Sequence, residues 1–125
     1  MNRRNLLLVD DESDIRRVAH LSLQHIGGWH VHEAASGAEA LSVVEELRPD
    51  VVLLDVMMPE MDGPATLARL RELPRMNGVP IVFLTAKALS SDHERLRTLG
   101  ASGVLTKPFD PLLLPGMVDA ILEGR

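Results

Sequence analysis

Five polar side chains that could do chemistry come directly after short apolar runs in this sequence. They are the carboxylates of Asp10, Asp11 and Asp55, the hydroxyl of Thr85 and the ammonium group of Lys107. Apolar runs of this length are typical of buried parallel strands, whose carboxyl ends form the ligand crevice of an open α/β sheet. If the runs pair side by side, these groups converge on one edge of the sheet.

Such a cluster predicts metal-assisted phosphoryl chemistry. Neighbouring carboxylates repel each other unless a cation binds between them. Oxygen ligands with open coordination positions suit Mg²⁺. A carboxylate beside a metal and an ammonium group is what phosphoryl transfer to an aspartate requires, because the positive charges offset repulsion between the carboxylate and the phosphoryl oxygens.

The composition narrows the class of protein. The chain has 125 residues, 46% of them hydrophobic and only 2% aromatic, which fits one domain with an aliphatic core. The net charge of −5 argues against direct nucleic-acid binding. No cysteine is present, so thiolate chemistry and disulfides are excluded. No apolar run approaches membrane-spanning length and no signal peptide is visible, so we expect a cytoplasmic protein without membrane contact.

Short apolar runs alternate with helix-period segments, which predicts βα units and a doubly wound parallel sheet. Four helices are expected between the strands and a fifth after the last one. The five expected strands are Asn5–Val9, Trp29–Ala34, Val51–Leu54, Val79–Leu84 and Gly103–Thr106.

The helices carry recognisable start signals. The second and fourth are expected to begin with capping boxes at Ser36 and Ser91. The third begins at Gly63-Pro64, with proline in its first turn, and the fifth is expected over Pro115–Leu122. The first follows Ser13, and its predicted buried stripe is Ile15, Val18, Ala19, Ser22 and Ile26.

Four motifs, in this order, resemble the receiver domain of bacterial two-component response regulators. They are Asp10-Asp11, Asp55–Gly63, Leu84-Thr85-Ala86 and Lys107-Pro108-Phe109. The resemblance covers the whole chain, so residues 1–125 are expected to form a single receiver domain. It implies an α/β, flavodoxin-like fold: a doubly wound five-stranded parallel sheet, with strand order 2-1-3-4-5 and five helices.

The resemblance also implies a role for each site residue. Asp55 is the expected phosphoacceptor, Thr85 is expected to hydrogen-bond the phosphoryl group, and Lys107 is expected to pair with it. The bond between Lys107 and Pro108 is expected to be cis. The expected Mg²⁺ ligands are Asp11, Asp10 mainly through a water, Asp55 and the backbone carbonyl of Met57.

By the same resemblance, the phosphodonor is a sensor histidine kinase or a phosphotransfer protein. The domain is expected to catalyse its own phosphorylation and dephosphorylation as a signalling domain, without being an enzyme in the ordinary sense. An unidentified downstream target is expected on the fourth helix, fifth strand and fifth helix, with Leu112–Leu114 as candidate contacts. The sequence leaves the oligomeric state open, a homodimer included.

Four other functions compete with the switch. A phosphoryl sink would share the chemistry without an output. A phosphatase of the haloacid dehalogenase type needs a second aspartate two residues after the first, where this chain has Met57. In a flavodoxin, the loop after the first strand binds a phosphate, which Asp10 and Asp11 would repel. A pseudo-receiver loses site residues, and none is lost here.

Two positions depart from the pattern of the family. Val104, three residues before Lys107, stands where an aromatic switch residue is common. Lys87, two residues after Thr85, places a cation near the mouth of the site. Both leave the expected chemistry intact, but they make the output mechanism and the lifetime of the phosphoryl group open questions.

Overall fold

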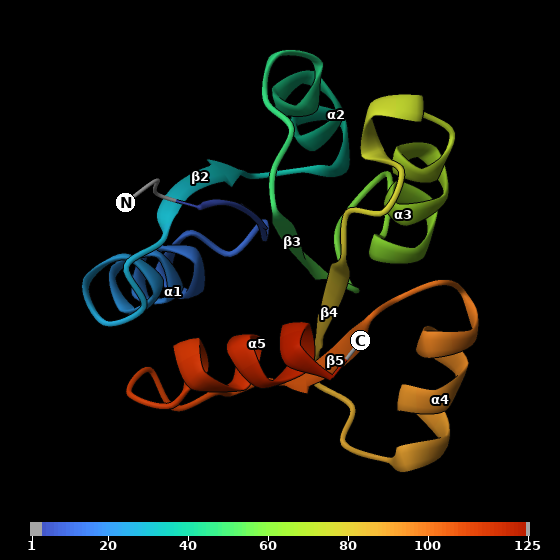
Figure 1. Ribbon diagram of the computed structural model, residues 1–125. Helices are drawn as coiled ribbons and strands as arrows, with labels where there is room; N and C mark the ends of the chain where they lie inside the picture. Colours follow the sequence, from blue (N-terminus) through green and yellow to red (C-terminus); the bar gives the residue numbers. More distant parts are fainter. Residues whose placement is uncertain (1–3, 125) are drawn as a thin grey trace.

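The computed structural model describes residues 4–124 as a five-stranded parallel sheet with helices on both faces (Figure 1). The strands are β1 (Asn5–Val9), β2 (His30–Ala34), β3 (Val51–Asp55), β4 (Ile81–Thr85) and β5 (Gly103–Thr106). Their spatial order is β2-β1-β3-β4-β5 and every neighbouring pair is parallel. The predicted strand order 2-1-3-4-5 is therefore confirmed.

Five α-helices alternate with the strands, as predicted, and a 3₁₀ helix, η1 (Pro74–Met76), precedes β4. The α-helices are α1 (Ser13–His25), α2 (Gly37–Glu46), α3 (Gly63–Arg71), α4 (Ser90–Thr98) and α5 (Leu114–Glu123). Between residues 4 and 124, no helix combines the length and apolar character needed to cross a membrane.

The sheet separates two hydrophobic cores. Successive strand residues point to opposite faces, so in β1 Leu6 packs with α1 and α5 whereas Leu7 packs with α2, α3 and α4. Figure 1 shows α1 and α5 together on one side of the sheet. Because β1, β3 and β4 are covered on both faces, they are apolar except for Asn5 at the start of β1, Asp55 at the end of β3 and Thr85 at the end of β4.

The predicted buried stripe of α1 is partly wrong. Ala19 and Ser22 are buried as predicted, but Val18 is 44% exposed and Ile26 is 54% exposed. Leu23, one turn after Ala19, is fully buried in their place. Helix periodicity gives the spacing of an apolar stripe, but the sheet decides which of several overlapping stripes faces inward.

The helix starts agree with the sequence for α2 and α3. At α2 the Ser36 hydroxyl accepts a hydrogen bond from the Glu39 amide at 3.1 Å. At α3 the Asp62 carboxylate accepts one from the Ala65 amide at 2.9 Å. The predicted capping box at Ser91 is wrong: α4 begins at Ser90, after Leu89, without a side-chain cap.

Candidate functional site

The carboxyl ends of four strands meet at one edge of the sheet. The pairing aligns Val9 with Leu54 and, further across the sheet, Asp55 with Leu84 and Thr85 with Thr106. The polar residues at or just beyond these ends are therefore neighbours, although they lie far apart in sequence. The structure brings together Asp10, Asp11, Asp55, Thr85 and Lys107, as the sequence predicts.

Three carboxylates form a compact acidic cluster. Oxygen atoms of Asp10, Asp11 and Asp55 lie within 4.8 Å of one another. Asp10 is fully buried, Asp55 is 3% exposed, and Asp11 faces solvent. Oxygen donors at this spacing, with one side open to water, fit a hard cation such as Mg²⁺.

Lys107 provides the positive charge opposite this cluster. Its ammonium nitrogen lies 2.9 Å from an Asp10 carboxylate oxygen, 3.1 Å from Asp55 Oδ1 and 3.3 Å from Glu12 Oε1. Its side chain is only 9% exposed, and its backbone amide donates to the Thr85 carbonyl at 2.7 Å. The predicted cis bond between Lys107 and Pro108 is confirmed.

Burial dominates the electrostatics of Asp55. It raises the pKa of this carboxyl from its ordinary value to about 6, with a further rise from Asp10 and an opposing effect from Lys107. Burial alone would lower the pKa of Lys107, but hydrogen bonds to Asp10 and Asp55 raise it above its ordinary value. The site therefore contains a firmly charged lysine and a carboxylate that is ionised at neutral pH only at an energetic cost.

Thr85 and Met57 flank the cluster. The Thr85 side chain is buried, and its hydroxyl accepts a hydrogen bond from the Lys87 amide at 3.1 Å. Met57 lies two residues after Asp55, and its side chain is 72% exposed. The role of its backbone carbonyl as a metal ligand stays a prediction.

Two residues near the site were missed by the sequence reasoning. Glu12 is a third partner of Lys107, and its position directly after the acidic pair is the only signal that pointed to it. Arg16 donates to the Asp10 carbonyl at 2.6 Å and to the Glu33 carboxylate at 2.7 Å, which fixes the backbone after β1. Its two partners, Asp10 and Glu33, lie in separate segments of the chain, so sequence spacing alone could not reveal this role.

Gly63 holds the loop after β3 close to the site. Its amide donates to the Val56 carbonyl at 2.8 Å. A Cβ atom at this position would lie 2.5 Å from the Asp55 carbonyl oxygen, which is too close for any side chain. The predicted helix start at Gly63-Pro64 thus has a packing reason: only glycine lets the start of α3 approach the backbone of Asp55.

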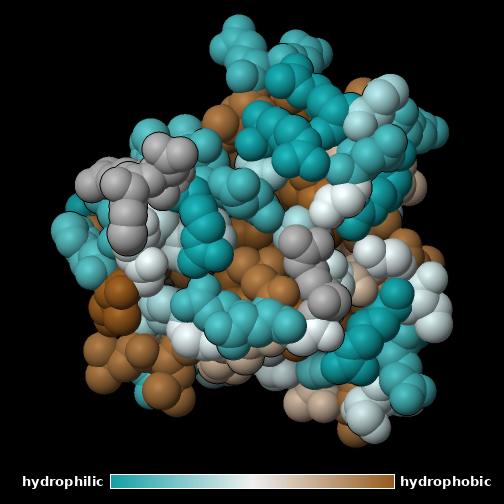
Figure 2. Space-filling view, viewed as in Figure 1, coloured by the Kyte–Doolittle hydropathy of each residue, from teal (hydrophilic) through white to brown (hydrophobic). Residues whose placement is uncertain are grey.

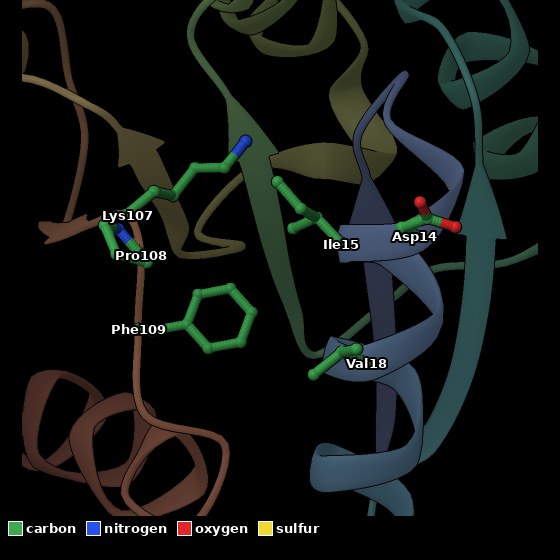
Figure 3. A pocket seen from close by; sticks show the side chains of 6 residues that line it. All are labelled: Asp14, Ile15, Val18, Lys107, Pro108 and Phe109. Carbon is green, nitrogen blue, oxygen red and sulfur yellow. The ribbon is translucent and has the colours of Figure 1, made fainter.

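An apolar pocket of about 210 Å³ opens beside Lys107 (Figure 3). Ile15 and Val18 of α1 point toward Lys107 and Phe109 across this pocket, while Asp14 points away. Hydrophobic surface is also visible over the start of α5 (Figure 2), where Leu112 is 73% exposed and Leu113 is 59% exposed. Leu114 is fully buried, so the run Leu112–Leu114 divides between surface and core.

Comparisons with known proteins agree with this geometry. The family model described as the response regulator receiver domain matches residues 6–119. Response regulator Rre1 of Synechocystis sp. is 38% identical over 121 residues, 97% of this chain and 52% of the relative. The alkaline phosphatase synthesis transcriptional regulatory protein PhoP of Bacillus subtilis is 39% identical over 123 residues, 98% of this chain and 50% of the relative. The chain thus spans about half the length of these two relatives.

Solved structures give the same result for the fold. The chemotaxis response regulator CheY4 of Vibrio cholerae superposes with a TM-score of 0.90 at 32% identity, covering 96% of this chain and 99% of that one. The receiver domain of Francisella response regulator 1452 superposes with a TM-score of 0.80 at 27% identity, covering 98% of both chains.

Proposed function

The chain belongs to the response regulator receiver domain family of two-component signalling, and from this premise we propose that it is a switch activated by phosphorylation of Asp55. One observation carries the choice of acceptor. Asp55 is the carboxylate at the end of a central strand, 3% exposed and 3.1 Å from the Lys107 ammonium group, within the acidic cluster. A nucleophile and the charge that offsets phosphoryl repulsion are thus already side by side.

We propose Mg²⁺ as the cofactor. Burial is the main cause of the raised pKa of Asp55, and repulsion from Asp10 adds to it. A bound cation would offset that repulsion. Asp11, Asp10 mainly through a water, Asp55 and the Met57 carbonyl would hold the ion. When bound, it would supply positive charge to the oxygens of the incoming phosphoryl group.

The proposed step is an in-line displacement at phosphorus. An oxygen of the Asp55 carboxylate forms a bond to phosphorus, and the bond from phosphorus to the donor's histidine nitrogen breaks, leaving the electron pair on that nitrogen. Lys107 Nζ, now paired with Asp55 Oδ1, moves to a phosphoryl oxygen. The Thr85 hydroxyl donates a hydrogen bond to another. Later, the oxygen of a water molecule forms a bond to phosphorus, the bond from phosphorus to the Asp55 oxygen breaks, and inorganic phosphate leaves the free Asp55 carboxylate behind.

The proposed phosphodonor is a sensor histidine kinase or a phosphotransfer protein. The proposed output surface consists of α4, β5 and α5, together with the exposed side chains of Leu112 and Leu113 directly before α5 as candidate contacts. Attraction between Thr85 and the phosphoryl group would move the segment 86–90 and thereby α4. The relatives are about twice as long as this chain, so the activity of any longer protein that contains it stays a separate question.

A labelling experiment tests the acceptor. The protein is incubated with Mg²⁺ and acetyl phosphate, and its intact mass is measured before and after mild hydrolysis. The parent should gain one labile phosphoryl group, and Asp55→Asn should gain none. Asp14→Asn, which removes an exposed carboxylate outside the acidic cluster, is the matched control and should be labelled like the parent. Labelling of Asp55→Asn at the parental rate would show that another residue is the acceptor.

A further inference from the structure

A chain of hydrogen bonds leads from Thr85 to α4. The Lys87 amide donates to the Thr85 hydroxyl at 3.1 Å, and the Lys87 carbonyl lies 2.8 Å from Nε2 of His93. A carbonyl oxygen can only accept, so Nε2 of His93 carries the hydrogen and donates it. The backbone of Lys87 is therefore held on both sides: its amide is bound to Thr85, the residue proposed to contact the phosphoryl group, and its carbonyl is bound to His93 of α4.

His93 also contacts the strand on the other side of Thr85. Its Nε2 lies 3.4 Å from the Thr106 hydroxyl. Thr106 is paired with Thr85 across β4 and β5 and directly precedes Lys107. The half-buried imidazole of His93 thus connects the segment after β4 with the end of β5, next to both of the groups proposed to bind the phosphoryl oxygens.

Helix α4 and the segment that leads into it are lightly packed. Leu96 is the only buried residue of α4, and the residue that precedes the helix, Leu89, is 69% exposed and provides no cap. A cavity of about 380 Å³ lies beside α4, with Thr85 and Lys87 in its lining. Within residues 4–124, the two bonds of Lys87 are the only side-chain hydrogen bonds to the segment 86–90. This segment has space to move and few other bonds to hold it.

We infer that His93 is a positioning residue that holds the segment 86–90 in the unphosphorylated conformation and passes its movement to α4. Turning the Thr85 hydroxyl toward a phosphoryl group removes the acceptor of the Lys87 amide. Lys87 then shifts, and its carbonyl moves the imidazole and with it α4. Val104, two residues before Thr106 in β5, has an aliphatic side chain that cannot form the hydrogen bonds that His93 forms. The inference rests on the proposed function, because it takes Thr85 as the group that senses the phosphoryl oxygens.

Two substitutions separate this role from simple packing. His93→Leu keeps most of the volume of the side chain and removes the donor. His93→Gln places an amide N–H near the position of Nε2 and keeps it. His25→Ala, at the exposed end of α1, is a control for loss of an imidazole elsewhere. Far-UV circular dichroism should show the same fold for all three.

The first measurement needs no phosphoryl group. In the phosphate-free protein, hydrogen exchange at the Lys87 amide should be about fivefold faster in His93→Leu, the change that corresponds to one hydrogen bond of about 1 kcal/mol. His93→Gln and His25→Ala should exchange like the parent. Unchanged exchange in His93→Leu, or equally fast exchange in His93→Gln, would overturn the inference.

The second measurement follows the output. With Mg²⁺ and beryllofluoride, the amide signals of Thr85, Lys87 and residues 90–98 of α4 should all shift in the parent. In His93→Leu the shift at Thr85 should remain and those along α4 should be lost, whereas His93→Gln should restore them. Parental shifts along α4 in His93→Leu would overturn the inference. If Asp55 cannot be labelled in any variant, the proposed function itself fails, and the exchange at Lys87 still decides whether His93 holds this segment.

Discussion

At the scale of the single residue, the burial of Asp55 has two opposing effects on its carboxylate. Burial keeps water away from its carboxylate, and the same burial, with Asp10 nearby, raises its pKa to about 6. At neutral pH the residue is ionised and can act as a nucleophile, but its charge destabilises the fold. Lys107 and a bound cation would each offset part of this cost.

The first prediction concerns this cost. The pKa of Asp55 is higher in the folded than in the unfolded protein, so the folded state holds more protons between pH 3.8 and about 6 and loses stability as pH rises through that range. Without Mg²⁺ at pH 7, Asp55→Asn should raise the free energy of unfolding by roughly 1–3 kcal/mol. Urea denaturation at pH 7 and pH 4 measures this, and the gain should shrink at the lower pH. A variant no more stable than the parent at pH 7 would contradict the raised pKa.

The second prediction concerns the lifetime of the phosphoryl group. Lys87 lines the cavity that also reaches Met57 and Thr85, so its charge lies near the mouth of the site. Lys87→Ala should shorten the lifetime of the phosphorylated form, because the side chain no longer obstructs water or stabilises phosphoryl oxygens. The effect should be less than about tenfold, since an exposed charge contributes about 1 kcal/mol or less. Decay after removal of acetyl phosphate measures it, and an unchanged or longer lifetime would rule out a shielding role.

At the scale of the element, the helices differ in how firmly they are held. Helices α2 and α3 each have a side-chain cap. Each also buries two apolar side chains, Ala40 and Val44 in α2 and Leu67 and Leu70 in α3. Helix α4 has no cap and buries only Leu96. A helix with few fixed contacts can change position at low cost, which suits the proposed output surface.

The third prediction compares two serines that the sequence presents alike. Ser36 accepts a hydrogen bond at the start of α2, whereas Ser91 lies inside the first turn of α4 and makes no capping bond. Ser36→Ala should lower the free energy of unfolding by about 1 kcal/mol, and Ser91→Ala should change it by less than about 0.5 kcal/mol. Chemical denaturation of both variants measures the difference. Equal losses would mean that Ser91 caps α4 after all.

At the scale of the whole molecule, the ion pairs of the site connect segments that are far apart in the sequence. Asp55 is the last residue of β3, whereas Asp10 and Lys107 directly follow β1 and β5, and their ion pairs join residues up to 97 positions apart. A cation bound here would therefore stabilise the entire fold rather than one loop. Because it binds only the folded protein, its stabilising effect grows with its concentration.

The fourth prediction uses this linkage. Raising free Mg²⁺ to about 100 times its dissociation constant should stabilise the parent by about 2.7 kcal/mol and raise its melting temperature by several degrees. Asp11→Ala should lose most of this rise, because it removes a proposed direct ligand, and Asp10→Ala should lose less of it. Differential scanning calorimetry with and without EDTA measures the effect. If Asp11→Ala responds to Mg²⁺ like the parent, Asp11 is not a ligand.

The sequence by itself determined where the strands lie, most element boundaries and which polar residues gather at one edge of the sheet, whereas the strand order followed from the resemblance to a known family. It could do so because buried parallel strands need continuous apolar runs, and because polar residues at their carboxyl ends must then share one edge. Asp55 and Lys107 are predictable in this way, since each directly follows such a run. These patterns depend only on residues that are close in sequence, so they can be recognised without knowing which segments lie next to each other in the fold.

Only the tertiary structure decided which partners these residues have. The stripe of α1 that faces inward, with Leu23 rather than Ile26, depends on how the helix rotates against the sheet. The third partner of Lys107, Glu12, and the contact of His93 with Lys87 and Thr106 depend on side chains brought together by packing. Periodicity gives spacing along one element, whereas hydrogen bonds and burial depend on the relative placement of several elements, which no local pattern contains.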